Sequence, residues 1–144
     1  MAATVSGHDL ERLADAAREA SRQAYCPYSK FRVGSAVLTE GGEIVSGCNV
    51  ENASYGLTIC AERNAVFQAV ARGARSLTAV AVYTPTSTPT LPCGACRQVI
   101  NEFGPDALVL SLCDGPDTIR TTLAALLPDA FGPKHLAGDH PEES

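Results

Sequence analysis

The sequence contains no tryptophan, and aromatic residues make up only 6% of its 144 residues. It also has no excess of positive charge, because 11 lysines and arginines stand against 16 aspartates and glutamates, a formal net charge of −5. Proteins that hold DNA or RNA usually present a cationic face, and those that hold single strands stack the bases on aromatic side chains. The composition therefore argues against a nucleic-acid partner.

The chain also lacks any apolar run close to the ~20 residues that cross a membrane. Residues 1–7 have neither the basic run nor the apolar segment of a secretory signal, so we expect none. The length suggests one domain over residues 1–144, large enough to form a core without covalent cross-links. We expect a cytoplasmic protein without a membrane partner, ending in a polar, frayed tail from about residue 134.

The six cysteines are an even number, which is compatible with a disulfide framework. A reducing compartment and a sufficient core favour free thiols instead. Three of the cysteines lie in or beside apolar stretches, and we expect them to be small buried side chains: Cys26, Cys48 and Cys113.

The other three cysteines, Cys60, Cys93 and Cys96, have spacings that allow them to bind one metal ion. The histidines all lie toward the chain ends, so sequence proximity offers no fourth ligand. Structural zinc sites use four protein ligands, whereas catalytic sites use three and keep one position open. This pattern favours a catalytic zinc site. The alternative, a structural zinc module that binds a partner, needs a fourth ligand for which no spacing gives a candidate.

Two charged residues follow Cys60 directly. Glu62 is a candidate for moving protons to and from the reacting groups, although a glutamate at a helix start is ordinarily a solvated surface residue. Three thiolates and a zinc ion leave a net charge of −1, and Arg63 is placed to offset it by donating to the sulfurs. Both cysteine segments are predicted to open helices, whose first N–H groups also favour thiolate.

The pattern of apolar residues along the chain predicts an α/β fold. Buried strands alternate with helices, which implies a partly parallel sheet with the site at the strand ends. The predicted helices are 9–25, 58–71, 93–103 and 121–127, and the predicted strands are 31–39, 43–50, 77–84, 107–113 and 118–120. Gly34 and Gly47 lie within predicted strands, where a glycine weakens the strand or marks the close approach of another backbone or a ligand.

The loop before the first metal segment carries Asn49 and Glu51. Their amide and carboxylate can bind sugar hydroxyls, but both residue types are also common in turns. Spacing alone leaves these two interpretations equally open.

Beyond single residues, the sequence resembles the small, homotetrameric cytidine deaminases, and Cys-x-Glu followed by Pro-Cys-x-x-Cys is the signature of zinc deaminases. The resemblance covers about residues 8–132 and is carried by five segments: 27–34, 47–55, 60–63, 92–98 and 126–131. It implies a three-layer α/β/α fold with a mixed five-stranded sheet, one zinc ion per subunit, and a homotetramer whose active sites are shared between subunits.

The resemblance also implies the reaction, the hydrolytic deamination of cytidine and deoxycytidine in pyrimidine salvage. Zinc-bound hydroxide would attack C4 of the pyrimidine, Glu62 would shuttle protons, and ammonia would leave to give uridine or deoxyuridine. Blasticidin-type and polynucleotide deaminases are the nearest alternatives, the latter disfavoured by the acidic composition.

The substrate-binding residues follow from the same resemblance. Asn49 and Glu51 would hold the ribose, Phe31 would pack against the nucleoside, and the Ala61 backbone N–H would contact the pyrimidine. Tyr55 and Phe131 would approach from neighbouring subunits. Taken without the resemblance, Phe131 is more simply interpreted as a side chain that fills the core.

Overall fold

A computed structural model describes residues 5–137 of the chain. At its centre is a five-stranded sheet with the order β2-β1-β3-β4-β5. Only β3 and β4 pair in parallel, while the other neighbours are antiparallel, so the sheet is mixed as predicted. The strands are β1 (Gly34–Thr39), β2 (Ile44–Cys48), β3 (Leu77–Tyr83), β4 (Leu108–Leu112) and β5 (Ile119–Thr122).

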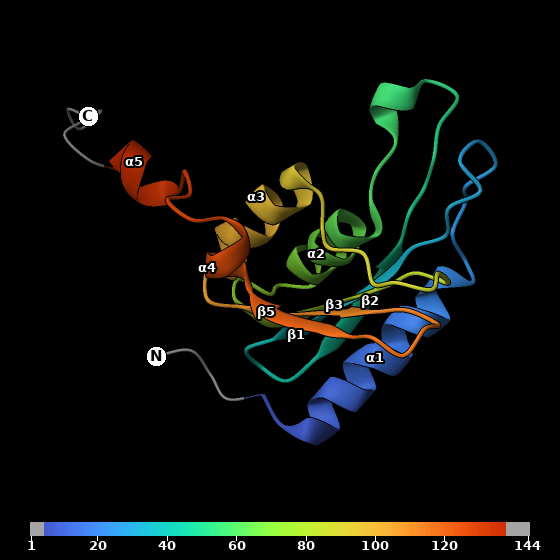
Figure 1. Cartoon of the computed structure of the whole chain (residues 1–144). Helices are drawn as coiled ribbons and strands as arrows, with labels where there is room; N and C mark the ends of the chain where they lie inside the picture. Colours follow the sequence, from blue (N-terminus) through green and yellow to red (C-terminus); the bar gives the residue numbers. More distant parts are fainter. Residues whose placement is uncertain (1–4, 138–144) are drawn as a thin grey trace.

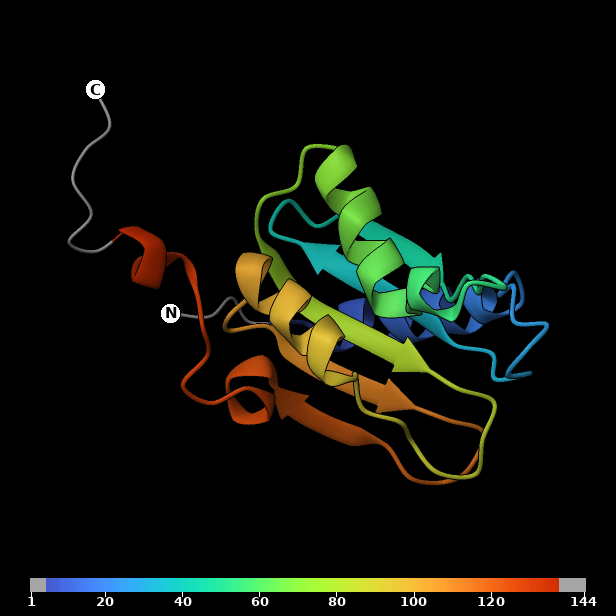
Figure 2. The same cartoon turned by 90° about the horizontal axis from the view of Figure 1, so that it is seen from above.

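Helices cover both faces of this sheet. Helix α1 (Gly7–Ser21) lies on one face, and α2 (Ala61–Ala71) and α3 (Gly94–Phe103) lie on the other (Figures 1 and 2). The short elements are η1 (Tyr55–Leu57), α4 (Leu123–Leu126) and α5 (Pro133–Ala137). The arrangement confirms the predicted three-layer α/β/α architecture.

Two of the helix boundaries that differ from the prediction lie near the site. Helix α1 ends at Ser21 because Tyr25 is already extended and forms a bridge with Val50. Helix α2 begins at Ala61 because Ile59 pairs with the other side of Val50. Val50 thus ties the polar loop to the segments on either side of it.

Each face of the sheet has its own apolar core. The core on the α1 face combines alanines with leucines such as Leu13, and the core on the α2–α3 face includes Val66 and Ile100. Two strand glycines allow the helices to approach closely, as predicted. A Cβ on Gly34 would lie 1.9 Å from the Ala17 carbonyl oxygen, and one on Gly47 would lie 2.5 Å from the Ala65 nitrogen. The Gly47 contact seats α2, which begins beside Cys60, directly on the sheet.

All six cysteines are free, so the disulfide framework is excluded. Cys26 and Cys113 are buried as expected, but the prediction for Cys48 was wrong, since this residue ends the edge strand β2 and is only half-buried. The tail expected from residue 134 begins instead with α5, and residues 138–144 lie outside the described part. Across residues 5–137, every helix is too short or too polar to span a bilayer.

Candidate active site

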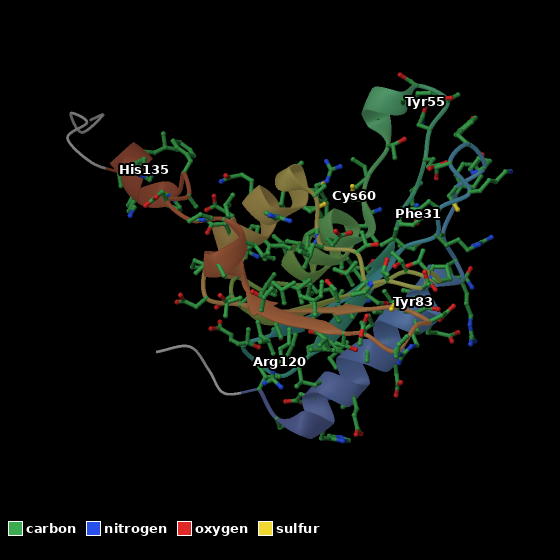
Figure 3. The ribbon with its side chains drawn as sticks, viewed as in Figure 1. Phe31, Tyr55, Cys60, Tyr83, Arg120 and His135 are labelled. Carbon is green, nitrogen blue, oxygen red and sulfur yellow. The ribbon has the colours of Figure 1, made fainter. Side chains whose placement is uncertain are left out.

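The ends of two neighbouring helices bring the three predicted metal ligands together. Cys60 is the N-cap residue of α2, Cys93 is the N-cap residue of α3, and Cys96 lies in the first turn of α3. The Sγ atoms of Cys60 and Cys93 are 3.9 Å apart, and those of Cys93 and Cys96 are 3.4 Å apart. Figure 3 shows Cys60 near the end of α2, on the side of the sheet that α2 and α3 cover.

This sulfur cluster fits a zinc ion. A tetrahedral ion with Zn–S bonds of about 2.3 Å holds its sulfur ligands about 3.8 Å apart, close to the distances found here. All three sulfurs lie within 4.8 Å of one another, and across residues 5–137 no fourth His, Cys, Asp or Glu joins this group. Sulfur donors favour zinc over magnesium or calcium. Three protein ligands match the number that catalytic zinc sites use.

The surroundings of the cluster favour thiolate. The Arg63 guanidinium donates to Cys60 Sγ at 3.4 Å, the contact that the sequence predicted. A hydrogen bond from Cys96, together with Arg63, lowers the pKa of the Cys60 thiol to about 5. The same hydrogen bond and burial raise the pKa of Cys96. In the metal-free protein Cys60 is therefore a thiolate and Cys96 a protonated thiol. Binding of the metal ion would release the proton of Cys96.

Glu62 lies in the first turn of α2, and only 5% of its surface is exposed to solvent. Burial raises the pKa of its carboxyl to about 7. An acid–base catalyst works best when its pKa is near the working pH, because it can then both accept and release a proton. The interpretation of Glu62 as a solvated surface residue was wrong.

Glu62 and two of the thiols open into one cavity of about 310 Å³. Ala61 also lines it, at the start of α2, and so do Phe31 and the two polar loop residues. The complete lining is Ser29, Phe31, Val33, Asn49, Glu51, Thr58, Cys60, Ala61, Glu62, Val82, Thr90, Leu91 and Cys93. The cavity therefore has a metal end at the cysteines and Glu62, and a polar end at Asn49 and Glu51.

Asn49 serves the loop structure as well as the cavity. Its Oδ1 accepts from the Val33 N–H at 2.9 Å, and its Nδ2 donates to the Phe31 carbonyl at 2.7 Å. These bonds hold the segment that carries Phe31 at the cavity wall. An amide has two N–H groups, so one of them is still available for a ligand.

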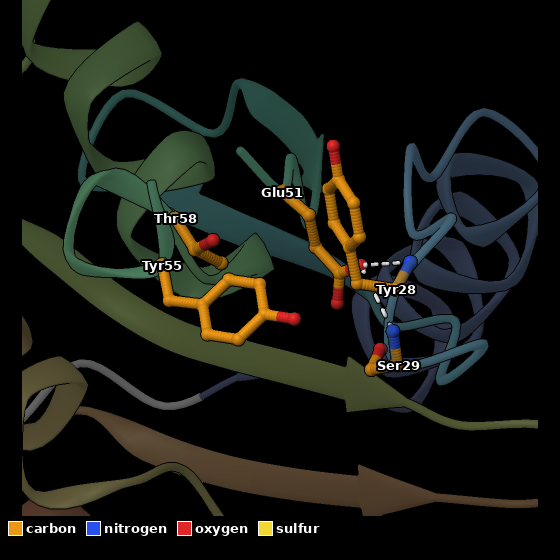
Figure 4. Close-up of a pocket in the computed structure, with 5 residues that line it drawn as sticks. All are labelled: Tyr28, Ser29, Glu51, Tyr55 and Thr58. Carbon is orange, nitrogen blue, oxygen red and sulfur yellow. Dashed lines mark hydrogen bonds between the residues drawn. The ribbon is translucent and has the colours of Figure 1, made fainter. Parts of the chain in front are cut away.

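Glu51 is fixed by the turn that precedes β1. Its Oε1 accepts from the backbone N–H groups of Tyr28 at 3.0 Å and Ser29 at 3.1 Å (Figure 4). Hydrogen bonding to Ser29 is the largest effect that lowers the pKa of the carboxyl. The side chain is therefore an ionised acceptor in a defined position at the cavity mouth.

Two of the predicted site residues, Tyr55 and Phe131, do not line the cavity of their own subunit. Tyr55 is 73% exposed and lines a second cavity of about 300 Å³ on the other side of Glu51, where its ring packs against Tyr28 (Figure 4). Phe131 is 56% exposed and stacks on His135. Figure 3 shows His135 far from Cys60. The interpretation of Phe131 as a core side chain was therefore wrong.

Six residues that line the cavity were not predicted as site residues from the sequence: Ser29, Val33, Thr58, Val82, Thr90 and Leu91. Val82 was assigned only to a buried strand, and Thr90 and Leu91 only to a loop. For Thr90 and Leu91 the available signal was their position directly before the Pro92-Cys93 segment, because residues next to a metal ligand in the sequence lie close to the metal.

A buried carboxyl beside three thiolates at helix N-termini defines the class of zinc-dependent hydrolytic deaminases. Residues 8–112 match the family described as cytidine and deoxycytidylate deaminase zinc-binding region. The chain is 50% identical over 131 residues to a cytidine deaminase of Sporosarcina psychrophila, covering 90% of this chain and 96% of that protein. It is 36% identical over 132 residues to a blasticidin-S deaminase of Bacillus cereus, with 86% and 92% covered.

Solved structures agree. A crystal structure of cytidine deaminase from Burkholderia pseudomallei aligns with a TM-score of 0.81 and 48% identity, covering 88% of this chain and all of that one. The chain belongs to the cytidine and deoxycytidylate deaminase family.

Proposed function

We propose that this protein deaminates free cytidine and deoxycytidine, giving uridine and deoxyuridine with release of ammonia. The observation that carries the proposal is a single cavity with the cysteine cluster and a protonatable Glu62 at one end and Asn49 and Glu51 at the other. The first end matches the amino-bearing base, and the second matches the hydroxyl-bearing sugar. Such a product and substrate pair belongs to pyrimidine salvage.

At the metal end, Cys60, Cys93 and Cys96 would hold a zinc ion, which would make a water molecule acidic enough to act as a nucleophile at neutral pH. Glu62 would take a proton from the attacking water and deliver it to the pyrimidine ring nitrogen. The same carboxyl would then take the remaining proton from the oxygen added at C4 and carry it to the departing amino group, so that water and cytidine become uridine and ammonia. The pKa of about 7 suits both transfers. The Ala61 N–H donates to the pyrimidine.

At the polar end, Glu51 accepts hydrogen bonds from ribose hydroxyls and Asn49 donates its free amide N–H. Both side chains are held in place by backbone groups before any ligand arrives, which lowers the entropy lost on binding. Phe31 packs against the nucleoside from the cavity wall. This pair, with Arg63 at the sulfurs, favours a nucleoside over blasticidin S.

We also propose a homotetramer that shares its active sites. Tyr55 and Phe131 are large, exposed aromatic side chains that miss the cavity of their own chain, as expected if each serves a neighbouring copy. The proposal includes one domain over residues 1–144 and a cytoplasmic location, which the six free cysteines support. Sedimentation gives the mass directly, and a monomeric yet fully active protein would remove the shared sites.

The test is turnover of cytidine, deoxycytidine and blasticidin S by one zinc-loaded preparation, followed by ultraviolet absorbance. We expect kcat/KM for both nucleosides to exceed that for blasticidin S by at least about 100-fold. The reverse order would assign the protein to the blasticidin deaminases. A cytidine-containing oligonucleotide included in the same assay should stay unchanged.

A structural zinc module is the alternative from another class. Cobalt substitution separates the two, because the absorption spectrum reports the number of sulfur ligands and an exchangeable water. We expect three sulfurs and an open position. Four sulfur ligands would end the enzymatic interpretation.

A further inference from the structure

Four threonines alternate along the segment between β3 and the second metal helix: Thr84, Thr86, Thr88 and Thr90. Thr84 follows the last residue of β3 and is fully buried. Its Oγ1 lies 2.7 Å from Thr86 Oγ1 and 3.4 Å from Thr90 Oγ1. Thr86 Oγ1 in turn donates to the Thr88 carbonyl at 2.7 Å. The hydroxyls of Thr90, Thr84 and Thr86 thus form a chain that ends on a backbone oxygen.

The Thr88 carbonyl, at the end of this series of hydroxyls, fixes the direction of every hydrogen bond in the series. A hydroxyl has one proton to donate, and a carbonyl oxygen can only accept. Thr86 gives its proton to the Thr88 carbonyl, so its contact with Thr84 must be one in which Thr84 donates. Thr84 has then used its only proton and can only accept from Thr90. The proton of Thr90 therefore points toward Thr84 and away from anything else that Thr90 contacts.

Thr90 is also part of the wall of the active-site cavity, where it stands three residues before Cys93. Because Leu91 and the metal ligand Cys93 follow it in the sequence and line the same cavity, we assign Thr90 to the metal end. With its proton committed to Thr84, the Thr90 hydroxyl offers only lone pairs to a ligand. The substrate and product of the proposed reaction differ at this end, because cytidine carries an amino group at C4 and uridine carries a carbonyl oxygen.

We propose that Thr90 is a specificity-determining residue that accepts a hydrogen bond from the cytidine amino group and disfavours the uridine carbonyl. The inference rests on the proposed function. The amino group of cytidine can donate a hydrogen bond to Thr90 Oγ1. The C4 carbonyl oxygen of uridine is an acceptor, so it would be repelled by the lone pairs of Thr90 Oγ1. The threonine chain therefore favours binding of the substrate and release of the product, without taking part in the chemical step.

Thr86→Val gives the sharpest test, because Thr86 does not line the cavity and acts only through the chain. Without the Thr86 oxygen, Thr84 is free to donate to Thr90, and Thr90 is free to donate to a ligand. Uridine should then bind about fivefold more tightly, the worth of one hydrogen bond. Because Thr90 can still accept, kcat/KM for cytidine should change by less than about twofold. Isothermal titration of the zinc-loaded protein with uridine gives the first value, and ultraviolet absorbance gives the second.

Three further variants complete the design. Thr90→Val should also tighten uridine binding, but with about a fivefold loss of kcat/KM for cytidine, and Thr90→Ser should keep both wild-type values. The control is Thr88→Val, since Thr88 contributes only its backbone carbonyl, which the substitution preserves. Unchanged uridine binding in folded Thr86→Val or Thr90→Val would overturn the role of Thr90. Failure of the proposed function is distinct, because the unmodified protein would then not turn over cytidine.

Discussion

The two ends of the active-site cavity are built in different ways. At the metal end, Cys60, Cys93 and Cys96 lie at the starts of α2 and α3, and Glu62 is buried beside them. At the polar end, Asn49 and Glu51 come from loops, and each is held by two hydrogen bonds to backbone groups. Regular elements thus fix the groups that carry the chemistry, and more exposed loops present the groups that recognise the substrate. Substitutions at the metal end should therefore act on the chemical step, and those at the polar end on recognition.

The largest loss of activity is expected when Glu62 is substituted. Glu62→Ala should keep its zinc but lose turnover by about 10⁴-fold, the upper range for acid–base catalysis. The measurements are kcat for cytidine and the zinc content of the same sample. Glu102→Ala, which removes an exposed glutamate from α3, is the matched control. A zinc-replete Glu62→Ala protein with a near-normal rate would defeat the assignment.

The second prediction concerns the stability of the metal-free protein. Burial raises the pKa of Glu62 from 4.5 to about 7 in the folded state, so the folded protein holds this proton more tightly than the unfolded chain. The contribution of Glu62 to the free energy of unfolding is therefore greatest below pH 4.5 and is lost as the pH rises through 7. Gln cannot ionise and does not share the decline. Metal-free Glu62→Gln should be more stable than the wild type by roughly 3 kcal/mol at pH 8.

Urea unfolding at pH 5 and pH 8 checks this value. The difference between the two proteins should be small at pH 5 and large at pH 8. A difference that does not depend on pH would mean that the carboxyl is not held in a poorly solvated position. Zinc-loaded samples should show a smaller difference, since the ion favours the charged carboxylate.

A smaller loss is expected at Arg63. Its guanidinium contacts Cys60 Sγ, and groups that support metal ligands typically contribute 10–100-fold to metal affinity or activity. Arg63→Ala should therefore lower kcat/KM by about 30-fold while changing Tm little. Arg72→Ala removes an exposed arginine just after α2 and serves as the control. Full activity in Arg63→Ala would remove this role.

Substitutions at the polar end should lower kcat/KM the least, and the loss should depend on the hydroxyls of the sugar. Glu51→Gln weakens acceptance from ribose hydroxyls, so kcat/KM for cytidine should fall about tenfold. The same substitution should change kcat/KM for 2′,3′-dideoxycytidine much less, because that nucleoside lacks both hydroxyls. Glu43→Gln, at an exposed position, is the control. Equal losses for both substrates would mean that Glu51 acts on the loop and not on the sugar.

The same contrast explains what could be predicted from the sequence. Cys60 and Glu62 are two residues apart, and Cys93 and Cys96 are three, so the arrangement within each pair follows from a short segment at a helix start. Apolar runs of strand and helix length predicted an α/β fold with a partly parallel sheet, while the three layers and the mixed sheet were implied by the family resemblance. These features depend on local chemistry that the sequence displays directly.

Loop geometry could not be predicted in the same way. The bridge between Tyr25 and Val50 shortens α1, and it depends on segments 25 residues apart. The dual use of Asn49, in the loop and in the cavity, also needs coordinates. Thr90 was overlooked because its hydroxyl gains meaning only when Thr84 and Thr86 lie beside it.

Metal removal tests the central claim most directly. A single preparation should be assayed with cytidine as isolated, after treatment with a chelator, and after zinc is returned, with metal content measured at each stage. We predict about one zinc ion per chain in the active protein, loss of turnover with loss of the ion, and recovery in proportion to the zinc restored. A metal-free protein that still deaminates cytidine at the full rate would contradict the account.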